Sequence, residues 1–339
     1  AEEGVKLDRV ITAEDEAEQA AAKRFPFLSY TELINLPPKE WVIDQILGAG
    51  DLGMVYGPPG SGKTFVLIDL MHAASLGRQF AMRFGVAKPM TVAYCAGEGQ
   101  GGLPERFAAA SHFYGTESLP HFTYVPIVPA LYYDQRSAQH IATIEQFIAE
   151  YRDAQNAGQV QALDLLVIDT LHSASVGAEE NSAKDMGEVL RLTKLAASEL
   201  GCAVMLVHHS NKAGTGERGS SSMRGAFDYM IECKPLASKF VMRCEKLKDG
   251  KGWKDQTFDL VAVGDTESVR VWWDEPGEMI STKGKLAEKL IAELKARPEI
   301  GFTAKSLAEA VGGTPASVNN ALARLESKAQ LRRVLHDET

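Results

Sequence analysis

The residues best suited to chemistry stand in one short run, GPPGSGKT, at positions 57–64. This run is the full G-x-x-x-x-G-K-[ST] pattern, and it lies between an apolar run and a helical pattern. Its glycines let successive backbone amides face an anion, and the following helix adds a positive dipole. Lys63 would then bind the β- and γ-phosphates, and the Thr64 hydroxyl would bind magnesium. We expect a site for ATP and Mg²⁺, with ATP held by Gly57, Pro58, Pro59, Gly60, Ser61, Gly62, Lys63, Thr64 and Phe65.

A second candidate is Asp169, which ends the apolar run LDLLVID. A carboxylate at the carboxyl end of a buried strand can hold magnesium through water. The plainer alternative is an aspartate that caps the following loop. The P-loop pattern upstream favours the magnesium role.

Hydrolysis also needs a base that orients water. In AAA+ proteins a glutamate directly follows the magnesium aspartate, but here Thr170 follows Asp169. Glu98, in the run VAYCAGEG, is the best candidate. In the RecA-like class the base stands at the end of the strand next to the P-loop strand, so we expect this class, with Glu98 as the base on that adjacent strand. The alternative is a solvated loop carboxylate.

The run VMLVHHSNK, residues 204–212, indicates a strand that ends in polar side chains. A histidine there can donate a hydrogen bond to the γ-phosphate and act as a sensor. Because side chains alternate along a strand, only one of His208 and His209 should reach nucleotide. We favour His209, against the alternative of a buried strand-end histidine.

The segment that follows, residues 210–225, is rich in glycine and serine, and we expect a flexible loop that does not pack into a core. Its Lys212, Arg218 and Arg224 suit phosphate contacts to single-stranded nucleic acid. It lacks aromatic residues for base stacking, and a mobile surface loop without a ligand is the alternative.

Further on, Lys246 and Lys248 share one face of a strand and could reach the nucleotide of a neighbouring subunit. Their alternative is a solvated lysine pair.

Positioning these residues requires a sheet. Continuous apolar runs separated by helical patterns predict an α/β fold with a mostly parallel sheet that is covered on both faces. Four later runs with short turns predict an antiparallel extension of that sheet. We expect parallel strands at Leu52–Tyr56, Met90–Ala96, Phe122–Ile127, Leu163–Asp169 and Ala203–His209; helices at Lys63–Ser75, Leu103–His112, Ala138–Ala154 and Lys184–Leu200; and antiparallel strands at Tyr229–Cys233, Phe240–Cys244, Thr257–Val263 and Ser268–Trp273.

Composition and charge divide the chain. Its 339 residues suit more than one domain. We expect an acidic flexible arm at 1–24, a lead-in segment at 25–51, the ATPase core at 52–275, a linker at 276–282 and a further domain at 283–339. The net charge is −9, but residues 283–339 carry +3, so the remainder carries −12 and nucleic-acid binding must be local.

Several function classes are excluded by what the sequence lacks. No apolar run is long enough to cross a bilayer, and no signal-peptide pattern opens the chain, which begins at Ala1. No Cys-x-x-Cys pair occurs among the four cysteines, so a zinc site is not expected. All four lie in apolar runs and are interpreted as reduced core residues. We expect a cytoplasmic protein without a membrane partner.

Residues 283–339 show the pattern helix, helix, glycine turn, helix, strand, which predicts a winged helix-turn-helix. Such a domain binds duplex DNA with its third helix and its wing. Docking to protein is an equally weighted alternative. The residues that would contact DNA are Asn319, Asn320, Arg324, Arg332 and Arg333.

The succession GPPGSGKT, AGEG, VIDTL, VHHSNK, RGSSSMRGAFD and EKLKDG resembles the RepA-like hexameric replicative helicases, a family of RecA/DnaB-type ATPases, over about residues 40–275. The resemblance implies a ring, with Lys63 and Thr64 at the phosphates and magnesium, Glu98 as base, Asp169 as the magnesium-water ligand and His209 as sensor. Related ring helicases insert a Lys-x-Arg pair from the neighbouring subunit. Lys248 stands where that arginine is usual, so the finger stays open between Arg224, Lys246 and Lys248.

Three functions follow as hypotheses. The first is an ATP-hydrolysing ring helicase or single-strand translocase in the DNA replication of a phage, plasmid or mobile element, assembled as a homo-hexamer on single-stranded DNA. The second is an ATP-switched regulator or loader that binds duplex DNA without unwinding it. The third is a small-molecule kinase, whose activity would not require the motifs from HHSNK to EKLKDG.

Overall fold

The computed structural model describes residues 27–134, 140–210, 221–264 and 266–274, together with isolated positions at 290, 294, 305–307, 318 and 322. The chain forms two compact units, residues 1–39 and residues 40–339. In the first, helix α2 (Tyr30–Ile34) begins after Ser29, whose hydroxyl accepts the Glu32 amide while the Glu32 carboxylate accepts the Ser29 amide. This reciprocal capping explains how so short a helix forms.

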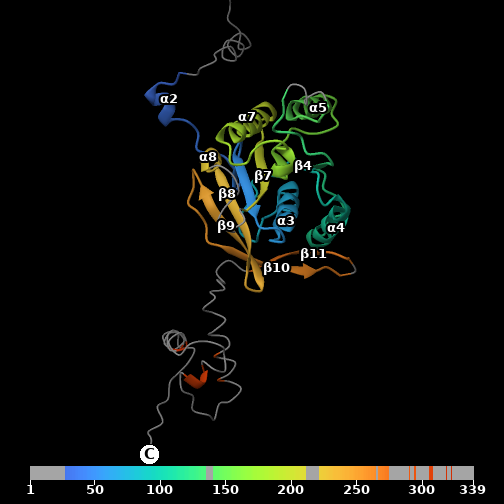
Figure 1. Ribbon diagram of the computed structural model, residues 1–339, viewed down its shortest axis with the longest axis vertical. Coiled ribbons are helices and arrows are strands. Elements are labelled where there is room, and N and C mark those ends of the chain that lie inside the picture. The colour runs from blue at the N-terminus through green and yellow to red at the C-terminus, as the bar shows by residue number, and fades with distance from the viewer. Residues whose placement is uncertain are drawn as a thin grey trace, which may run out of the picture. The chain divides into compact units, whose positions relative to one another are not determined.

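The second unit is built on a nine-stranded sheet within the described residues (Figure 1), in the order β11-β10-β9-β8-β3-β7-β6-β4-β5. The strands from β8 to β5 in this order are parallel, and β9, β10 and β11 continue the sheet antiparallel. The mostly parallel sheet with an antiparallel extension is therefore confirmed. The bounds are β3 Leu52–Gly57, β4 Val92–Ala96, β5 Phe122–Val125, β6 Leu165–Asp169, β7 Ala203–His209, β8 Tyr229–Leu236, β9 Lys239–Leu247, β10 Gln256–Ala262 and β11 Val269–Trp273.

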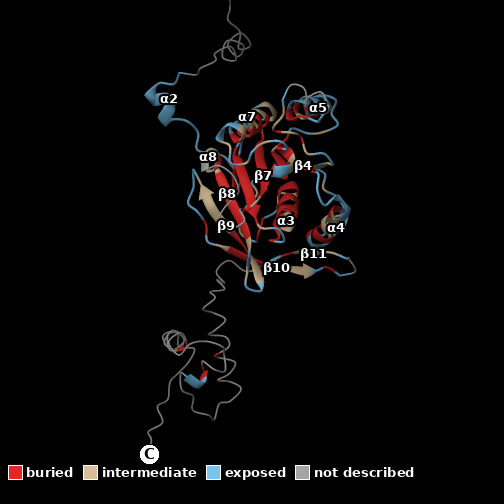
Figure 2. Cartoon of the chain, viewed as in Figure 1, coloured by how far each residue is buried: buried red, intermediate tan, exposed pale blue. Residues whose placement is uncertain are grey.

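Helices cover both faces of this sheet, and the strand residues alternate between them. Along β6, Val167 belongs to the apolar cluster that includes α3 (Lys63–Leu76) and α4 (Leu103–Tyr114). Its neighbour Leu166 belongs to the cluster that includes α5 (Ile144–Asn156) and α7 (Ala183–Leu200). We call these sides the α3 face and the α7 face. Figure 2 shows the central strands buried between them, which is why their sequences are apolar without interruption.

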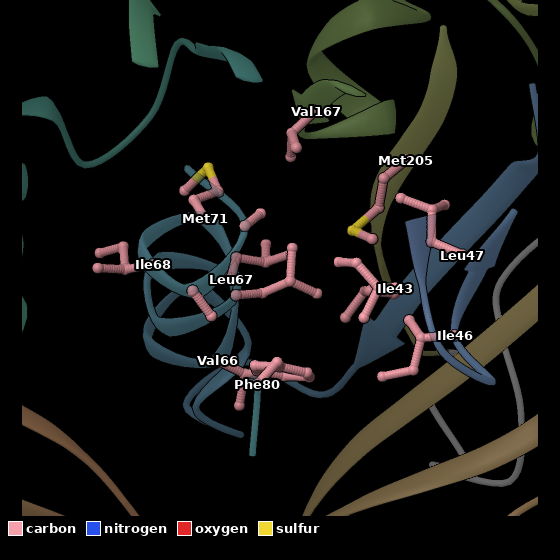
Figure 3. Close-up of a cluster of buried hydrophobic side chains, with 14 of the residues drawn as sticks. Ile43, Ile46, Leu47, Val66, Leu67, Ile68, Met71, Phe80, Val167 and Met205 are labelled. Atoms are coloured by element: carbon pink, nitrogen blue, oxygen red, sulfur yellow. The ribbon is translucent and has the colours of Figure 1, made fainter. Parts of the chain in front are cut away.

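Part of the predicted lead-in segment belongs to the core of the second unit. Strands β1 (Trp41–Ile43) and β2 (Leu47–Gly48) form a small antiparallel hairpin. Apart from Trp41, its apolar residues are buried in the cluster of the α3 face, as Figure 3 shows for Ile43, Ile46 and Leu47. In addition, the Trp253 indole donates to the Gln45 carbonyl, which ties the hairpin to the segment after β9.

The predicted strands and most of the predicted helices match the structure to within three residues at either end, and two predictions differ by more. Helix α5 begins after Thr143, whose hydroxyl accepts the Gln146 amide, and not at Ala138. The expected loop 210–225 is wrong at its carboxyl end, since residues Ser221–Ala226 form helix α8. Met223 and Phe227 are fully buried on the α7 face, and their burial stabilises a helix that the glycine and serine content disfavours.

In the described part of the chain, no helix is both long and apolar enough to cross a membrane. The four cysteines are free thiols, and burial raises the pKa of Cys95, Cys202 and Cys233 to about 12. These thiols are therefore protonated core side chains at neutral pH.

The expectations for residues 1–24, 276–282 and 283–339 lie outside the described residues, apart from isolated positions in the last segment. Four of those positions, Leu290, Leu307, Val318 and Leu322, are buried. They belong to the apolar stripes from which a winged helix is predicted, and that prediction stays untested.

Candidate nucleotide-binding and hydrolysis site

The P-loop leaves β3 at Gly57 and enters α3 at Lys63, which is the context that the sequence pattern requires. Gly60 and Gly62 have φ angles of 72° and 81°, a left-handed conformation that glycine adopts without strain. Glycine is required at position 57 for a different reason, which is the close approach of the β8 backbone. A Cβ atom added there would lie 1.9 Å from the carbonyl oxygen of Cys233 on β8, so no side chain fits.

Lys63 lies inside the turn of the loop. Its Nζ donates to the carbonyl oxygens of Gly57 at 2.9 Å and Pro58 at 3.0 Å, and the side chain is buried. Burial lowers the pKa of this ammonium, while Cys233 and Asp169 act in the opposite direction. The cation is thus held by loop carbonyls at the place where β- and γ-phosphates would bind.

The remaining loop residues divide by exposure. Pro59 and Gly60 are exposed, and a Cβ atom on Gly60 would meet nothing within 4 Å, so the outer turn faces open space. The Ser61 hydroxyl is buried and has no hydrogen-bond partner among the described residues. Phe65 lies under the guanidinium of Arg106, whose carbon is 5.2 Å from the ring centre. The loop therefore offers an open rim and an inward polar group, as a phosphate cradle requires.

Asp169 ends β6 and points to the α3 face, the same side as Lys63, because Val167 two residues earlier lies on that face. Its Oδ2 accepts a hydrogen bond of 2.8 Å from the Tyr94 hydroxyl on β4. Burial raises the pKa of this carboxyl, an effect that Glu98 adds to and that Tyr94, Lys63 and Arg106 oppose. A bound cation would favour the ionised form.

These residues fit a magnesium ion. Mg²⁺ prefers hard oxygen ligands and retains several waters, so one hydroxyl and one carboxylate suffice on the protein side. Thr64, in the first turn of α3, and Asp169 supply this pair from elements that meet on the α3 face. Because burial raises the pKa of Asp169, a cation beside it would stabilise the ionised carboxylate.

The position predicted for the strand that precedes Glu98 is wrong. Strand β4 is not adjacent to the P-loop strand, because β7 and β6 lie between β4 and β3. Strand β4 is as fully buried as β6, so an apolar sequence does not set the order of the strands; a parallel crossover can skip positions that later strands fill. Glu98 nevertheless comes close to Asp169, since Ala96 is in register with Asp169 and the Gly97 amide contacts the Asp169 carbonyl at 3.4 Å.

The Glu98 carboxylate is exposed and makes one contact of particular interest. Its Oε1 accepts a hydrogen bond of 2.7 Å from the hydroxyl of Ser173, in the short helix α6 (Leu171–Ala174) that follows Asp169. Glu98 is also the acidic side chain that acts on the Asp169 carboxyl. The structure thus brings together the two carboxylates that the sequence singles out.

Strand β7 separates its two histidines as alternation requires. His209 is in register with Gly57. It stands two residues after Val207 and therefore shares its side of the sheet, the α3 face, with Lys63. His208 is in register with Tyr56 and is buried. It stands two residues after Leu206 and therefore lies on the α7 face. The side of the sheet therefore favours His209 as the histidine next to nucleotide.

The two lysines proposed to act on a neighbouring subunit contact their own chain. Lys246 Nζ donates to the carbonyl oxygens of Arg224 at 2.6 Å and Phe227 at 2.5 Å, at the end of α8. Burial lowers the pKa of this ammonium. Lys248, which follows β9, is mostly exposed and pairs with Asp228 at 3.2 Å. Arg224 itself pairs with Glu245 at 3.7 Å.

Most of the residues predicted to contact nucleic acid lie outside the described part of the chain. Of that set, Arg224 is in the described part of the chain. The others lie outside it: Lys212, Arg218, Asn319, Asn320, Arg324, Arg332 and Arg333.

Sequence reasoning missed three groups around the carboxylates: Tyr94, Arg106 and the pair Thr170 and Ser173. Tyr94 could have been found, since it stands two residues before Ala96 in the strand VAYCA and so shares its face. Thr170 and Ser173 could also have been found, because they have the Thr-x-x-Ser spacing of a helix cap. Arg106 carried no sequence signal, because only the path of α4 brings it to Phe65.

The fold and the site together define a P-loop ATPase with an α/β fold. An AAA domain family model matches residues 18–215, which is more than half of the chain and contains the P-loop, Glu98, Asp169 and His209. The chain belongs to this family.

Similar folds occur among solved structures. A KaiC-like protein of Pyrococcus horikoshii is 15% identical with a TM-score of 0.45, covering 69% of this chain and all of that one. The RadB recombinase is 17% identical with a TM-score of 0.43, covering 63% of this chain and 88% of that one. The comparison with curated proteins found no match.

Proposed function

We propose that this protein is an ATP-hydrolysing ring helicase or single-stranded nucleic-acid translocase that works in the cytoplasm in the DNA replication of a phage, plasmid or mobile element. ATP and Mg²⁺ are its cofactors. Its partners are single-stranded DNA, further copies of the chain in a ring such as a hexamer, and duplex DNA through residues 283–339.

One observation carries the proposal. Ser210, which directly precedes the basic segment 211–220 in the sequence, lies at the nucleotide site, because its amide donates to the Gly57 carbonyl of the P-loop at 3.1 Å. The residue before it, His209, is in register with Gly57 on the same side as Lys63. A change at the γ-phosphate would therefore be transmitted to a segment that carries Lys212 and Arg218.

The described chain resumes with α8. Lys246 donates to the carbonyl oxygens of Arg224 in α8 and of Phe227 just after it. Lys246 is therefore engaged within its own subunit, whereas the side chain of Lys248 is 61% exposed. Of the two lysines, Lys248 is the better candidate to reach a neighbouring subunit's nucleotide, and such a residue acts only in an oligomer.

The test combines turnover, unwinding and mass. We expect ATP hydrolysis to rise when an oligodeoxythymidylate is added, and a forked duplex to be unwound. Particle mass in solution should increase to that of a ring with a non-hydrolysable ATP analogue and the oligonucleotide. Lys63→Ala should abolish turnover. Lys212→Ala with Arg218→Ala should remove the oligonucleotide's effect, and Lys194→Ala, an exposed charge on α7, is the matched control.

The outcomes separate the alternatives. Tight binding to duplex DNA without strand separation would overturn the helicase and support the ATP-switched regulator or loader. If nucleic acid does not change the rate of ATP turnover and phosphate is transferred to a metabolite, the protein is a kinase.

A further inference from the structure

Glu98 depends on a neighbouring helix for its orientation. The carboxylate stands on an exposed loop two residues beyond β4, and a glutamate there has three rotatable side-chain bonds. The Ser173 hydroxyl donates to its Oε1 at 2.7 Å. This short bond to a charged acceptor selects one orientation among several.

Ser173 is itself held in place. The hydroxyl of Thr170 caps α6 by accepting the Ser173 amide at 3.2 Å, and the two hydroxyl oxygens lie 3.1 Å apart. A serine hydroxyl has one hydrogen. Because Ser173 donates it to Glu98, Thr170 must be the donor in the hydroxyl pair. The order of donation thus runs from Thr170 to Ser173 to Glu98.

The helix beneath these hydroxyls is rigidly seated. Leu171 and Ala174 are buried on the α7 face, and the Leu131 amide donates to the Ala174 carbonyl. Thr170 directly follows Asp169, so the anchor of Ser173 is covalently joined to the predicted magnesium ligand. Helix α6 therefore connects Asp169 to Ser173, the residue that binds the Glu98 carboxylate.

The backbone of the Glu98 loop is fixed from the other side. The Gly97 amide contacts the Asp169 carbonyl at 3.4 Å, and the Gln100 side chain donates to the Pro126 carbonyl at 2.9 Å. With both backbones held, the remaining freedom lies in the Glu98 side chain. That freedom is what the Ser173 bond removes.

We propose that Ser173 is a positioning residue for Glu98, which it holds in the orientation that aligns the attacking water. The proposal rests on the function proposed for Glu98 as base. Ser173 does not touch nucleotide or water in this scheme, and its effect passes through Glu98. Its loss should lower kcat and leave the affinity for ATP unchanged, since an interaction of this kind matters in the transition state and not in binding.

The experiment compares five variants of the full chain: three single changes at Ser173 and Ser175, the Glu98→Gln variant, and Glu98→Gln combined with Ser173→Ala. Ser173→Ala should lower kcat about 10-fold, the factor that corresponds to one hydrogen bond to a charged group, with the Kd for a non-hydrolysable ATP analogue unchanged. Ser173→Thr keeps a hydroxyl and should restore most of the rate. Ser175→Ala is the matched control, because the Ser175 hydroxyl binds the Leu171 carbonyl of the same helix. It should leave kcat near that of the parent.

The double variant separates the two proposals. In a Glu98→Gln background, Ser173→Ala should cause no further loss of turnover, because no base remains for Ser173 to orient. If Glu98→Gln abolishes turnover while Ser173→Ala is fully active, the positioning role is refuted and the base stands. Equal losses in Ser173→Ala and Ser175→Ala would also refute it, as general damage to α6. If Glu98→Gln is fully active, the assignment of the base itself fails.

Discussion

The Tyr94 hydroxyl donates a 2.8 Å hydrogen bond to Oδ2 of Asp169, across two neighbouring strands of the parallel sheet. Tyr94 is buried, and burial together with the Asp169 charge raises the pKa of its phenol. The tyrosine is therefore a fixed neutral donor. Its hydroxyl holds one of the two carboxylate oxygens of Asp169 in place.

The first prediction concerns this bond. Tyr94→Phe removes the donor but keeps the ring, so the buried carboxylate loses a hydrogen bond to a charged acceptor, worth about 1.5–3 kcal/mol. We expect the pKa of Asp169 to rise further, a higher magnesium requirement and several-fold slower turnover. Titration of turnover against Mg²⁺ checks this. An unchanged magnesium requirement would show that the bond does not orient the ligand. Tyr124→Phe, which removes a hydroxyl bonded to the Ala96 carbonyl, is the control.

The second prediction separates nucleotide binding from hydrolysis. Glu98→Gln keeps the side-chain shape but cannot accept a proton, so a loss of turnover of about 100-fold or more is expected with ATP binding retained. Binding of a fluorescent ATP analogue and phosphate release measure the two properties. Glu105→Gln, an exposed glutamate on α4, should behave like the parent. Retained hydrolysis in the Glu98 variant would place the base elsewhere.

The third prediction compares two P-loop glycines. Gly57→Ala places a methyl group 1.9 Å from a backbone carbonyl oxygen that cannot move freely, so we expect a loss of about 3 kcal/mol of stability or failure to fold. Gly60→Ala meets no atom within 4 Å and costs only the strain of its positive φ, about 1 kcal/mol. Denaturant unfolding of the two variants would rank them. Equal stability would contradict the close approach of β3 and β8.

The fourth prediction distinguishes Lys246 from Lys248. Lys246→Ala removes the donor to the carbonyls that end α8, so stability should fall by about 1 kcal/mol. Lys248→Ala breaks an exposed ion pair and should cost less than about 1 kcal/mol. In mixtures with the parent chain, Lys248→Ala subunits should reduce turnover by more than their fraction. A simple proportional decrease would argue against action on a neighbour's nucleotide.

The fifth prediction is a pH dependence that originates away from the site. Asp69 of α3 is fully buried, and this burial raises its pKa from 3.8 to about 6, although Trp273 and Tyr114 donate hydrogen bonds to it. The folded chain therefore binds this proton more tightly than the unfolded chain. The resulting stabilisation is complete below pH 3.8 and is lost as the pH rises through about 6.

Urea unfolding across this range tests the sign. The contribution of Asp69 to the free energy of unfolding should fall by about 3 kcal/mol from about pH 4 to about pH 7. Asp69→Asn should flatten that dependence, and Asp153→Asn, an exposed residue on α5, should not. A dependence that survives in Asp69→Asn would assign it to another group.

Local chemistry is what the sequence determined by itself. The P-loop needs glycine, lysine and threonine at set spacings because neighbouring backbone atoms bind the phosphates, so GPPGSGKT and the flanking β3 and α3 could be predicted. Uninterrupted apolar runs likewise predicted the buried strands and the covered sheet. Strand β7 was predicted to its exact bounds, Ala203–His209, and Asp169 at the end of β6.

Only the tertiary structure decided what depends on long-range placement. The order of the strands put β7, and not β4, beside the P-loop, because a parallel crossover can skip positions that later strands fill. The bonds of Tyr94 to Asp169 and of Ser173 to Glu98 join residues 75 positions apart. Burial of Met223 and Phe227 overrode a sequence rich in glycine and serine to form α8. Such contacts arise from packing, which no single stretch of residues encodes.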